Sequence, residues 1–382
     1  MSNPWTVLPA LTLLAAATAF AQTPPAPLPT PGMAGPLQSA PPNTFNAGPL
    51  GTIEINGIVS GLGLIQSNPA PGNGTGEAAL SNGEIFLQKT DGWFQFYLQA
   101  GVYDLPMLGM PFMRNGKTLT DMFGPVPVGY IKLAPRKDFS VLIGLLPSLI
   151  GAESTFTFQN MNIERGLLWN QENNVNRGVQ VNETIGRLTA SLSWNDGYYS
   201  NRYSWLSGSL TYAFNPANSL AFTAGANLGA TAFRNLATPV QNNGSIYDVI
   251  YTYSKGHWVV QPYLQIDTVP ANQAAGIPKG ASATGGAVLV TYNFPHHFSL
   301  AGRAEYLTTT GTPAGDAVNL LYGPGSGAWS VTVTPTFQDH AFFVRGEFSF
   351  VGAMNVTPGY AFGNPGLARS QTRGVIETGF LF

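Results

Sequence analysis

The segment Trp258-Val-Val-Gln-Pro-Tyr-Leu-Gln-Ile-Asp267 alternates apolar and polar residues with a period of two. One face of it carries Trp258, Val260, Leu264 and Ile266, and the other face carries Gln261, Tyr263, Gln265 and Asp267. The segment Phe342-Phe-Val-Arg-Gly-Glu-Phe-Ser-Phe350 repeats the pattern. Successive side chains of a β-strand point to opposite faces, so both segments are predicted to be strands with one apolar and one polar face.

Similar segments recur along the chain from residue 51 onward, and about sixteen of them can be counted. They are residues 52–66, 83–89, 93–103, 127–134, 139–146, 177–182, 187–196, 204–214, 219–229, 245–254, 257–267, 283–294, 298–308, 327–337, 341–352 and 371–382. Several are shorter than the roughly 9–11 residues that a tilted strand needs to cross a bilayer. Fourteen or eighteen strands therefore remain open.

The connections between these segments alternate in length. Short turns are predicted at 90–92, 135–138, 183–186, 215–218, 255–256, 295–297 and 338–340. Longer loops are predicted at 67–82, 104–126, 147–176, 197–203, 230–244, 268–282, 309–326 and 353–370. Tight periplasmic turns opposite longer external loops are typical of an outer-membrane β-barrel. The predicted fold is therefore an all-β, transmembrane, antiparallel up-and-down barrel of about sixteen strands.

The composition of the 382-residue chain agrees with a lipid-embedded barrel. Only 9% of the residues are charged, although 44% are hydrophobic, whereas soluble domains carry about 25% charged residues. No apolar run after residue 21 is long enough for a membrane helix. The net charge of −2 gives no electrostatic footprint for nucleic acid. The absence of cysteine excludes a disulfide framework and a cysteine metal site.

Aromatic residues collect beside the short turns on the apolar face. They are Phe94, Phe139, Phe214, Trp258, Phe294, Phe298, Phe337 and Phe342. Aromatic rings at one depth predict the interfacial girdle of a membrane barrel. The chain ends in Thr378-Gly-Phe-Leu-Phe382, which resembles the C-terminal strand of bacterial outer-membrane proteins. That resemblance implies that Phe380 and Phe382 belong to the signal read by the barrel-assembly machinery.

The N-terminal region predicts export. Residues 1–21 are expected to be a signal peptide, because an apolar stretch ends in the small-x-small sequence Ala19-Phe20-Ala21, with cleavage near Ala21. The first six residues lack Lys and Arg, so a buried N-terminal helix stays an alternative. Residues 22–50 form a predicted Pro-rich periplasmic linker, either a bare spacer or a binding tail. Residues 51–382 are the predicted barrel.

Four short motifs lie in the middle of the chain: Gly151-Ala-Glu153, Asn162-Ile-Glu-Arg-Gly-Leu-Leu-Trp169, Asn176-Arg-Gly-Val-Gln-Val181 and Ser193-Trp-Asn-Asp-Gly197. Together they resemble the putative β-barrel porin-2 family. The resemblance extends over about residues 50–382 and implies an outer-membrane channel, without identifying a substrate. Similarity to porins also implies that a homotrimer is an option.

The polar faces of the strands predict a wet and mostly neutral lumen wall. Charged residues join this face in three later strands and one earlier strand: Arg187, Arg303, Glu305, Arg345, Glu347, Arg373 and Glu377. An Arg facing lipid at the bilayer midplane would cost about 2–4 kcal/mol, so placement in the lumen is expected. Two roles stay open for these charges, mutual pairing that stiffens the wall and a transverse field across the pore.

The third and longest loop, residues 147–176, is a candidate pore constriction. In general porins the loop at this position folds into the barrel, and the resemblance implies the same here. The charged residues of the loop and its exit are Glu153, Glu164, Arg165, Glu172 and Arg177. The acidic residues of the loop are expected to face Arg303, Arg345 or Arg373. Such charged clusters tune ion selectivity in pores. The alternative is a solvated loop that folds outward.

No enzymatic site is predicted. All four histidines, at positions 257, 296, 297 and 340, lie beside short turns, and no nucleotide-binding, zinc-protease or nucleophile-elbow motif occurs. No metal and no cofactor are expected. The sequence favours a porin that lets small hydrophilic solutes diffuse through a water-filled channel, and the alternative is a surface adhesin or scaffold with little conductance. Expected partners are outer-membrane lipid and lipopolysaccharide, the barrel-assembly machinery during biogenesis and small solutes, without nucleic acid.

Overall fold

The computed structural model describes residues 33–232 and 234–382. The predicted signal peptide and the first part of the predicted linker lie outside these residues. No helix of the described part is long and apolar enough to cross a membrane.

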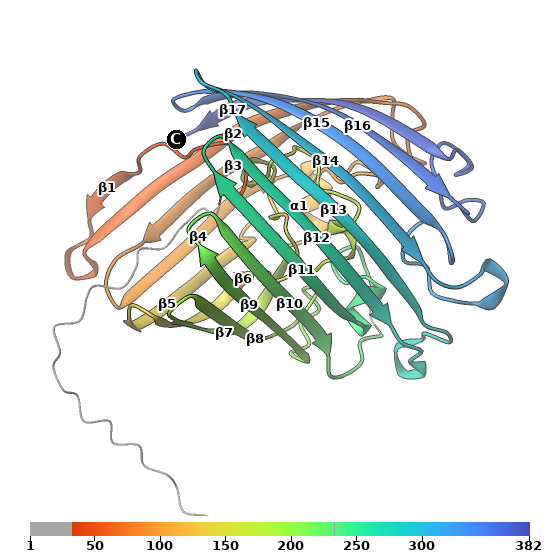
Figure 1. Cartoon of the computed structure of the whole chain (residues 1–382), viewed down its shortest axis with the longest axis horizontal. Helices are drawn as coiled ribbons and strands as arrows, with labels where there is room; N and C mark the ends of the chain where they lie inside the picture. Colours follow the sequence, from red (N-terminus) through yellow and green to blue (C-terminus); the bar gives the residue numbers. More distant parts are fainter. Residues whose placement is uncertain (1–32, 233) are drawn as a thin grey trace, which may run out of the picture.

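The described chain is a closed antiparallel barrel of sixteen strands, β2 to β17, each paired with its sequence neighbours (Figure 1). The first eight are β2 (Thr52–Gln66), β3 (Gly76–Lys89), β4 (Phe94–Tyr103), β5 (Val128–Arg136), β6 (Phe139–Pro147), β7 (Val175–Ile185), β8 (Leu188–Asn195) and β9 (Trp205–Asn215). The others are β10 (Asn218–Asn227), β11 (Ser245–Lys255), β12 (Trp258–Val269), β13 (Ala281–Asn293), β14 (Phe298–Thr309), β15 (Gly327–Asp339), β16 (Phe342–Met354) and β17 (Ser370–Leu381). The last strand pairs with β2, with Glu377 opposite Leu62, and this pairing closes the sheet.

The predicted strand number and the alternation of short turns and long loops are confirmed, and the main difference concerns β3. This strand begins at Gly76 instead of residue 83, so the first external loop shortens to residues 67–75. The first half of β3 consists mostly of polar and small residues, so the sequence shows no clear alternation of apolar and polar residues there. A register shift at Ser60 and Gly61 of β2 accommodates the irregularity. Short helices occur in the loops, among them α1 (Asn115–Asp121), η2 (Thr157–Gln159) and η3 (Trp169–Gln171).

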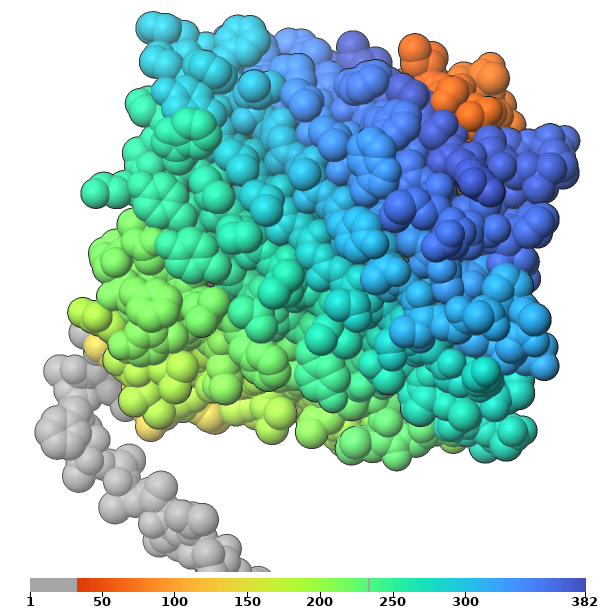
Figure 2. Space-filling view, turned by 45° about the vertical axis from the view of Figure 1, so that its right-hand side comes forward, coloured from red at the N-terminus to blue at the C-terminus, as the bar shows by residue number. Residues whose placement is uncertain are grey.

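The outer face of the barrel carries many exposed apolar side chains. Figure 2 shows the outer surface of the green-to-blue part of the chain. Outward side chains such as Leu264, Phe348 and Ile376 are more than half exposed, as expected where acyl chains replace water. Aromatic rings beside the short turns contact one another, including Phe298 with Phe337 at 5.2 Å and Tyr292 with Phe294 at 4.6 Å between ring centroids.

The inner face is less uniformly wet than the sequence predicts. An aromatic cluster fills the lumen beside β3 to β5, where Phe86, Tyr97 and Tyr130 are buried. Phe156 and Phe158, from the loop after β6, pack into the same cluster, with Phe158 5.6 Å from Phe86 between ring centroids. This sector of the lumen is therefore a packed core, because the loop brings its own apolar side chains to cover the wall.

The predicted linker is not a bare spacer over its described part. β1 (Asn43–Asn46) pairs with the first residues of β2 and lies beside the C-terminus of the chain (Figure 1). It is followed by η1 (Gly48–Leu50). Residues 33–42 pack at the periplasmic end of the lumen, where Leu37 is fully buried. The proline-rich composition does not reveal this packing, because a proline segment can pack without forming a regular strand.

Candidate functional site

The loop between β6 and β7, residues 148–174, lies inside the barrel. Its side chains bond to walls that are distant in sequence: Asn162 Nδ2 donates to Thr334 Oγ1 at 2.7 Å, and Thr157 Oγ1 donates to Glu377 Oε1 at 2.7 Å. Asn162, Glu164 and Arg165 are buried. The loop therefore crosses the lumen toward β15, β16 and β17.

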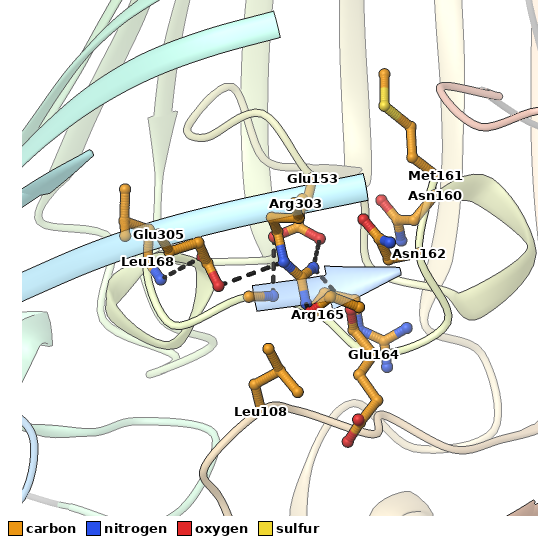
Figure 3. A network of polar contacts seen from close by, with 12 residues as sticks. Leu108, Glu153, Asn160, Met161, Asn162, Glu164, Arg165, Leu168, Arg303 and Glu305 are labelled. Carbon is orange, nitrogen blue, oxygen red and sulfur yellow. Dashed lines mark hydrogen bonds and ion pairs between the residues drawn. The ribbon is translucent and has the colours of Figure 1, made fainter. Parts of the chain in front are cut away.

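Arg303 and Glu305 of β14 hold the two arms of this loop (Figure 3). Nη1 of Arg303 donates to Glu153 Oε1 at 2.6 Å and to the carbonyl of Glu164 at 2.8 Å. The carboxylate of Glu305 accepts the backbone N–H of Leu167 at 3.1 Å. The two residues are two positions apart on one strand, so both side chains point into the lumen.

Arg345 and Glu347 of β16 repeat this arrangement further along the loop. Arg345 donates to the carbonyls of Thr157, Asn160 and Met161, each at 2.9 Å. Glu347 accepts the backbone N–H of Ile163 at 2.5 Å and that of Glu164 at 3.0 Å. An Arg therefore binds loop carbonyls and a Glu two residues later binds loop N–H groups, which satisfies both kinds of buried backbone group.

Arg373 and Glu377 of β17 complete the set. Nη1 of Arg373 donates to Glu164 Oε1 and to the Met107 carbonyl, both at 2.7 Å. Glu377 lies 3.6 Å from Arg345. Met107 belongs to the preceding long loop, so the wall also fixes that loop. We call Arg303, Glu305, Arg345, Glu347, Arg373 and Glu377 the clamp.

The wall beside the clamp, on β11 and β12, carries carboxylates without basic partners. Asp248 of β11 accepts from Thr223 Oγ1 at 2.8 Å and from the Gly151 backbone N–H at 3.0 Å. Glu172 of the loop accepts from Gln265 Nε2 at 2.8 Å, and Asp267 of β12 is buried nearby. Within the described residues none of these three carboxylates forms an ion pair. We call Asp248, Asp267 and Glu172 the acidic wall.

Burial shifts the titration of the loop charges. It raises the pKa of the Glu172 carboxyl well above its ordinary value, and the neighbouring Asp248 raises it further. Burial also raises the pKa of Glu153, while the Arg303 guanidinium acts in the opposite direction. Burial lowers the pKa of Arg165 to about 10, and surrounding carboxylates, Glu153 first, oppose that shift. Arg165 therefore remains a cation at neutral pH.

Two predicted site residues lie apart from the loop charges. Arg177 sits in β7, where Nε donates to Asp196 at 2.7 Å and the guanidinium lies 3.9 Å from the Tyr199 ring centroid. Arg187 is not part of the lumen wall. It occupies the turn Gly186-Arg187 between β7 and β8, is exposed, and donates to the Phe214 carbonyl at 2.8 Å. The turn needs a positive φ of 62° at Gly186, and this tight turn moves Arg187 out of the strand.

Cavities flank the inward loop. One of about 280 Å³ lies between residues 150–156 and the wall at Tyr97, Gln99 and Tyr130. Another of about 940 Å³ lies at the periplasmic end, lined by Thr252, Gln261 and Thr336 together with the N-terminal segment. The loop thus narrows the lumen without filling it.

The C-terminal aromatic residues face outward, where Phe380 and Phe382 are about half exposed. Across residues 33–232 and 234–382, no three His, Asp or Glu side chains gather closely enough to hold a metal ion. The four histidines lie in the short turns after β11, β13 and β15.

Sequence reasoning missed the acidic wall as a group. Asp267 was placed on the polar face of its segment, but nothing in the sequence links it to Asp248 and Glu172. The signal was weak, because the three residues come together only when β11 and β12 pair and the loop folds inward. An Asp at an inward position of a membrane strand is the feature that could have found them.

Sixteen strands, short turns on one side and an inward third loop define a porin-type outer-membrane barrel. Residues 52–382 match the family described as Putative beta-barrel porin-2, OmpL-like. The chain belongs to this family. Comparison with curated proteins finds no match.

Solved structures share the fold at low sequence identity. The anion-selective porin from Comamonas acidovorans is 11% identical, with a TM-score of 0.60, over 86% of this chain and 99% of that one. The outer-membrane channel DcaP of Acinetobacter baumannii is 10% identical, with a TM-score of 0.57, over 86% and 97%. The trimer form of OmpT from Vibrio cholerae is 8% identical, with a TM-score of 0.55, over 86% and 99%.

Proposed function

We propose that this protein is a porin that lets small hydrophilic solutes diffuse across the outer membrane. The observation that carries the proposal is the closed barrel with a loop bonded across its lumen and cavities on both sides of that loop. A barrel of about sixteen strands is wide enough for an aqueous channel, whereas about eight strands would be filled by side chains.

The constriction is assigned to residues 148–174, with Glu153, Glu164, Arg165 and Glu172 as its charged groups. The clamp holds the loop in place, and two of these charged groups, Glu153 and Glu164, are paired with Arg303 and Arg373. The acidic wall lacks such pairing, so those of its carboxyl groups that are ionised give the channel a preference for cations, which grows as the pH rises. We assign no catalytic residue and no cofactor.

Other parts of the proposal concern the environment of the barrel. Signal-peptide cleavage near Ala21 would release the mature chain to the periplasm, and Phe380 and Phe382 would be read during assembly. The exposed apolar strands contact lipid, and the external loops contact lipopolysaccharide. A homotrimer is supported by the trimer form of a protein with the same fold.

Planar-bilayer recording of the purified protein tests the proposal. Stepwise conductance is expected, with a reversal potential in a KCl gradient that shifts toward the potassium equilibrium potential. A silent bilayer would favour an adhesin or scaffold. Reversing the charge of Glu164 or Arg165 should change the reversal potential, and an unchanged value would remove these residues from the constriction.

A further inference from the structure

Residues 33–42 occupy the periplasmic end of the lumen, on the side of the short turns. Leu37 is fully buried in the cluster that contains Ile58, Phe343 and Leu381 from the inner faces of β2, β16 and β17. The segment carries no charged residue and contains three prolines, Pro36, Pro41 and Pro42. Such a segment can pack inside the barrel mouth without placing an unpaired charge there.

The segment touches the tip of the inward loop. The backbone N–H groups of Ala34 and Gly35 both donate to the Gln159 carbonyl at 2.8 Å. A Cβ at Gly35 would lie 2.1 Å from the Asn160 carbonyl oxygen, so a residue with a side chain does not fit this contact. The N-terminal segment and the loop are therefore in direct backbone contact within the lumen.

The segment is also bonded to the wall on two sides. The backbone N–H of Gln38 donates to Gln338 Oε1 at 2.8 Å, and Gln338 Nε2 donates back to the Gln38 carbonyl at 2.7 Å. Asn56 Nδ2 donates to the Ala40 carbonyl at 3.1 Å. Gln338 lies near the end of β15 and Asn56 near the start of β2, so these bonds hold the segment across the opening.

The remaining opening lies to one side. The cavity of about 940 Å³ is bounded by residues 33–41 and by the walls of β11 to β15. A solute leaving the constriction on this side would pass between the segment and inward polar residues such as Thr252, Gln261 and Thr336.

We propose that residues 33–42 are an internal plug that narrows the periplasmic exit of the channel. β1 follows the plug directly and continues the line of β17 along β2, with Asn43 opposite Ile55 where Leu381 is opposite Ile58. This pairing fixes the C-terminal end of the plug to the barrel wall. This inference rests on the proposed porin function, because a plug has meaning only in a conducting barrel.

Deletion of residues 33–42 from the full-length chain, leaving β1 in place, tests the plug. Single-channel conductance is expected to rise about twofold, because a cross-section now filled by protein opens to water. Unchanged conductance in a protein that conducts would overturn the plug and leave the porin assignment intact. A wild-type protein that never conducts would overturn the porin assignment instead.

Substitution gives a second route if the deletion variant does not assemble. Gly35→Leu should displace the plug and raise conductance, because its side chain collides with the Asn160 carbonyl. Gly116→Leu is the matched control, since a Cβ at Gly116 in α1 meets no atom within 4 Å, and it should conduct like the wild type. Equal conductance of both variants would contradict the proposal.

Thiol labelling reads the position of the plug without recording currents. The chain has no cysteine, so Leu37→Cys introduces one reporter. The single variant Leu37→Cys should react slowly with a water-soluble maleimide. The double variant Leu37→Cys with Gly35→Leu should react rapidly. Rapid labelling of Leu37→Cys by itself would show that the plug does not occupy the exit.

Discussion

The clamp and the acidic wall lie on nearby strands of one barrel, β14 to β17 and β11 to β12, and use charge in different ways. In the clamp each Arg is buried against loop carbonyls or loop carboxylates, and Glu305 and Glu347 accept loop N–H groups. In the acidic wall three carboxylates receive hydrogen bonds from neutral groups or lie beside one another without an Arg. The first arrangement fixes a loop, and the second leaves carboxyl groups whose ionisation no Arg compensates.

The difference shows that charge in a pore does not by itself mark the permeation path. A buried charge that has its partners is a structural element, because removing one partner leaves the other uncompensated. A carboxylate without a basic partner changes the potential of the lumen and can attract cations. Variants for which both the unfolding stability and the ion selectivity are measured therefore test the difference between the clamp and the acidic wall.

Arg345→Met is expected to have the largest effect. It removes the donor for three loop carbonyls and leaves Glu377 without its nearest Arg. The cost should be about 3–5 kcal/mol, measured as a lower unfolding temperature in detergent. Conductance should become larger and noisier as the loop loosens. A variant as stable as the wild type would show that the clamp does not hold the loop.

Removing both partners of one clamp contact should cost less than removing the Arg alone. Glu164 forms its ion pair with Arg373, so Arg373→Met leaves a buried carboxylate unpaired, whereas Arg373→Met with Glu164→Gln does not. The double variant should recover about 1–3 kcal/mol relative to the single one. Strictly additive losses in the unfolding measurement would argue against a structural pair.

Asp248→Asn should change selectivity with little change in stability. The amide oxygen can still accept from Thr223 and from the Gly151 N–H, and the lumen loses one negative charge. The reversal potential should move away from the potassium equilibrium potential, while the unfolding free energy changes by less than about 1 kcal/mol. A large loss of stability without a shift in reversal potential would assign the acidic wall to structure.

The pH dependence of selectivity should report Glu172. Because the pKa of this carboxyl is raised above its ordinary value of 4.5, it keeps its proton where an exposed Glu is ionised. Raising the pH through the raised pKa adds negative charge, so cation preference should increase. The stability that its proton confers, fully present below pH 4.5, should be lost over the same rise.

Glu172→Gln provides the comparison for that titration. The variant should show a flatter dependence of reversal potential on pH than the wild type. Identical pH profiles of the two proteins would remove Glu172 from the set of groups that act on permeating ions.

Arg187→Ala is expected to have the smallest effect. The side chain is exposed in a turn and donates to one carbonyl, and surface changes of this kind stay within about 0.5 kcal/mol. Neither conductance nor reversal potential should change. A shift in selectivity would show that the turn faces the permeation path after all.

The barrel could be predicted because its strands follow a local rule. Each segment such as 258–267 shows its two faces without reference to any other part of the chain. β3 begins earlier than predicted because its first half, Gly76 to Asn82, is mostly small or polar, and Arg187, predicted as the first residue of a strand, lies in the turn just before β8. Both errors lie at strand ends, where local alternation stops being informative.

The interior could be predicted only in part because it is built from contacts distant in sequence. Of the loop acids expected to face clamp arginines, Glu153 lies by Arg303 and Glu164 by Arg373, whereas Glu172 bonds to Gln265 instead. The aromatic packing of Phe158 on Phe86 and the burial of Leu37 were not visible, because each depends on a segment entering the lumen. The Pro-rich composition of residues 22–50 favours a spacer, whereas residues 33–42 pack at the periplasmic end of the lumen.

The conductance of a variant in which residues 152–171 are replaced by a short Gly-Ser linker tests the central claim most directly. If the clamped loop forms the constriction, single-channel conductance should rise severalfold and the discrimination between cations and anions should weaken. A conductance equal to that of the intact protein would place the narrowest part of the channel elsewhere and contradict the account.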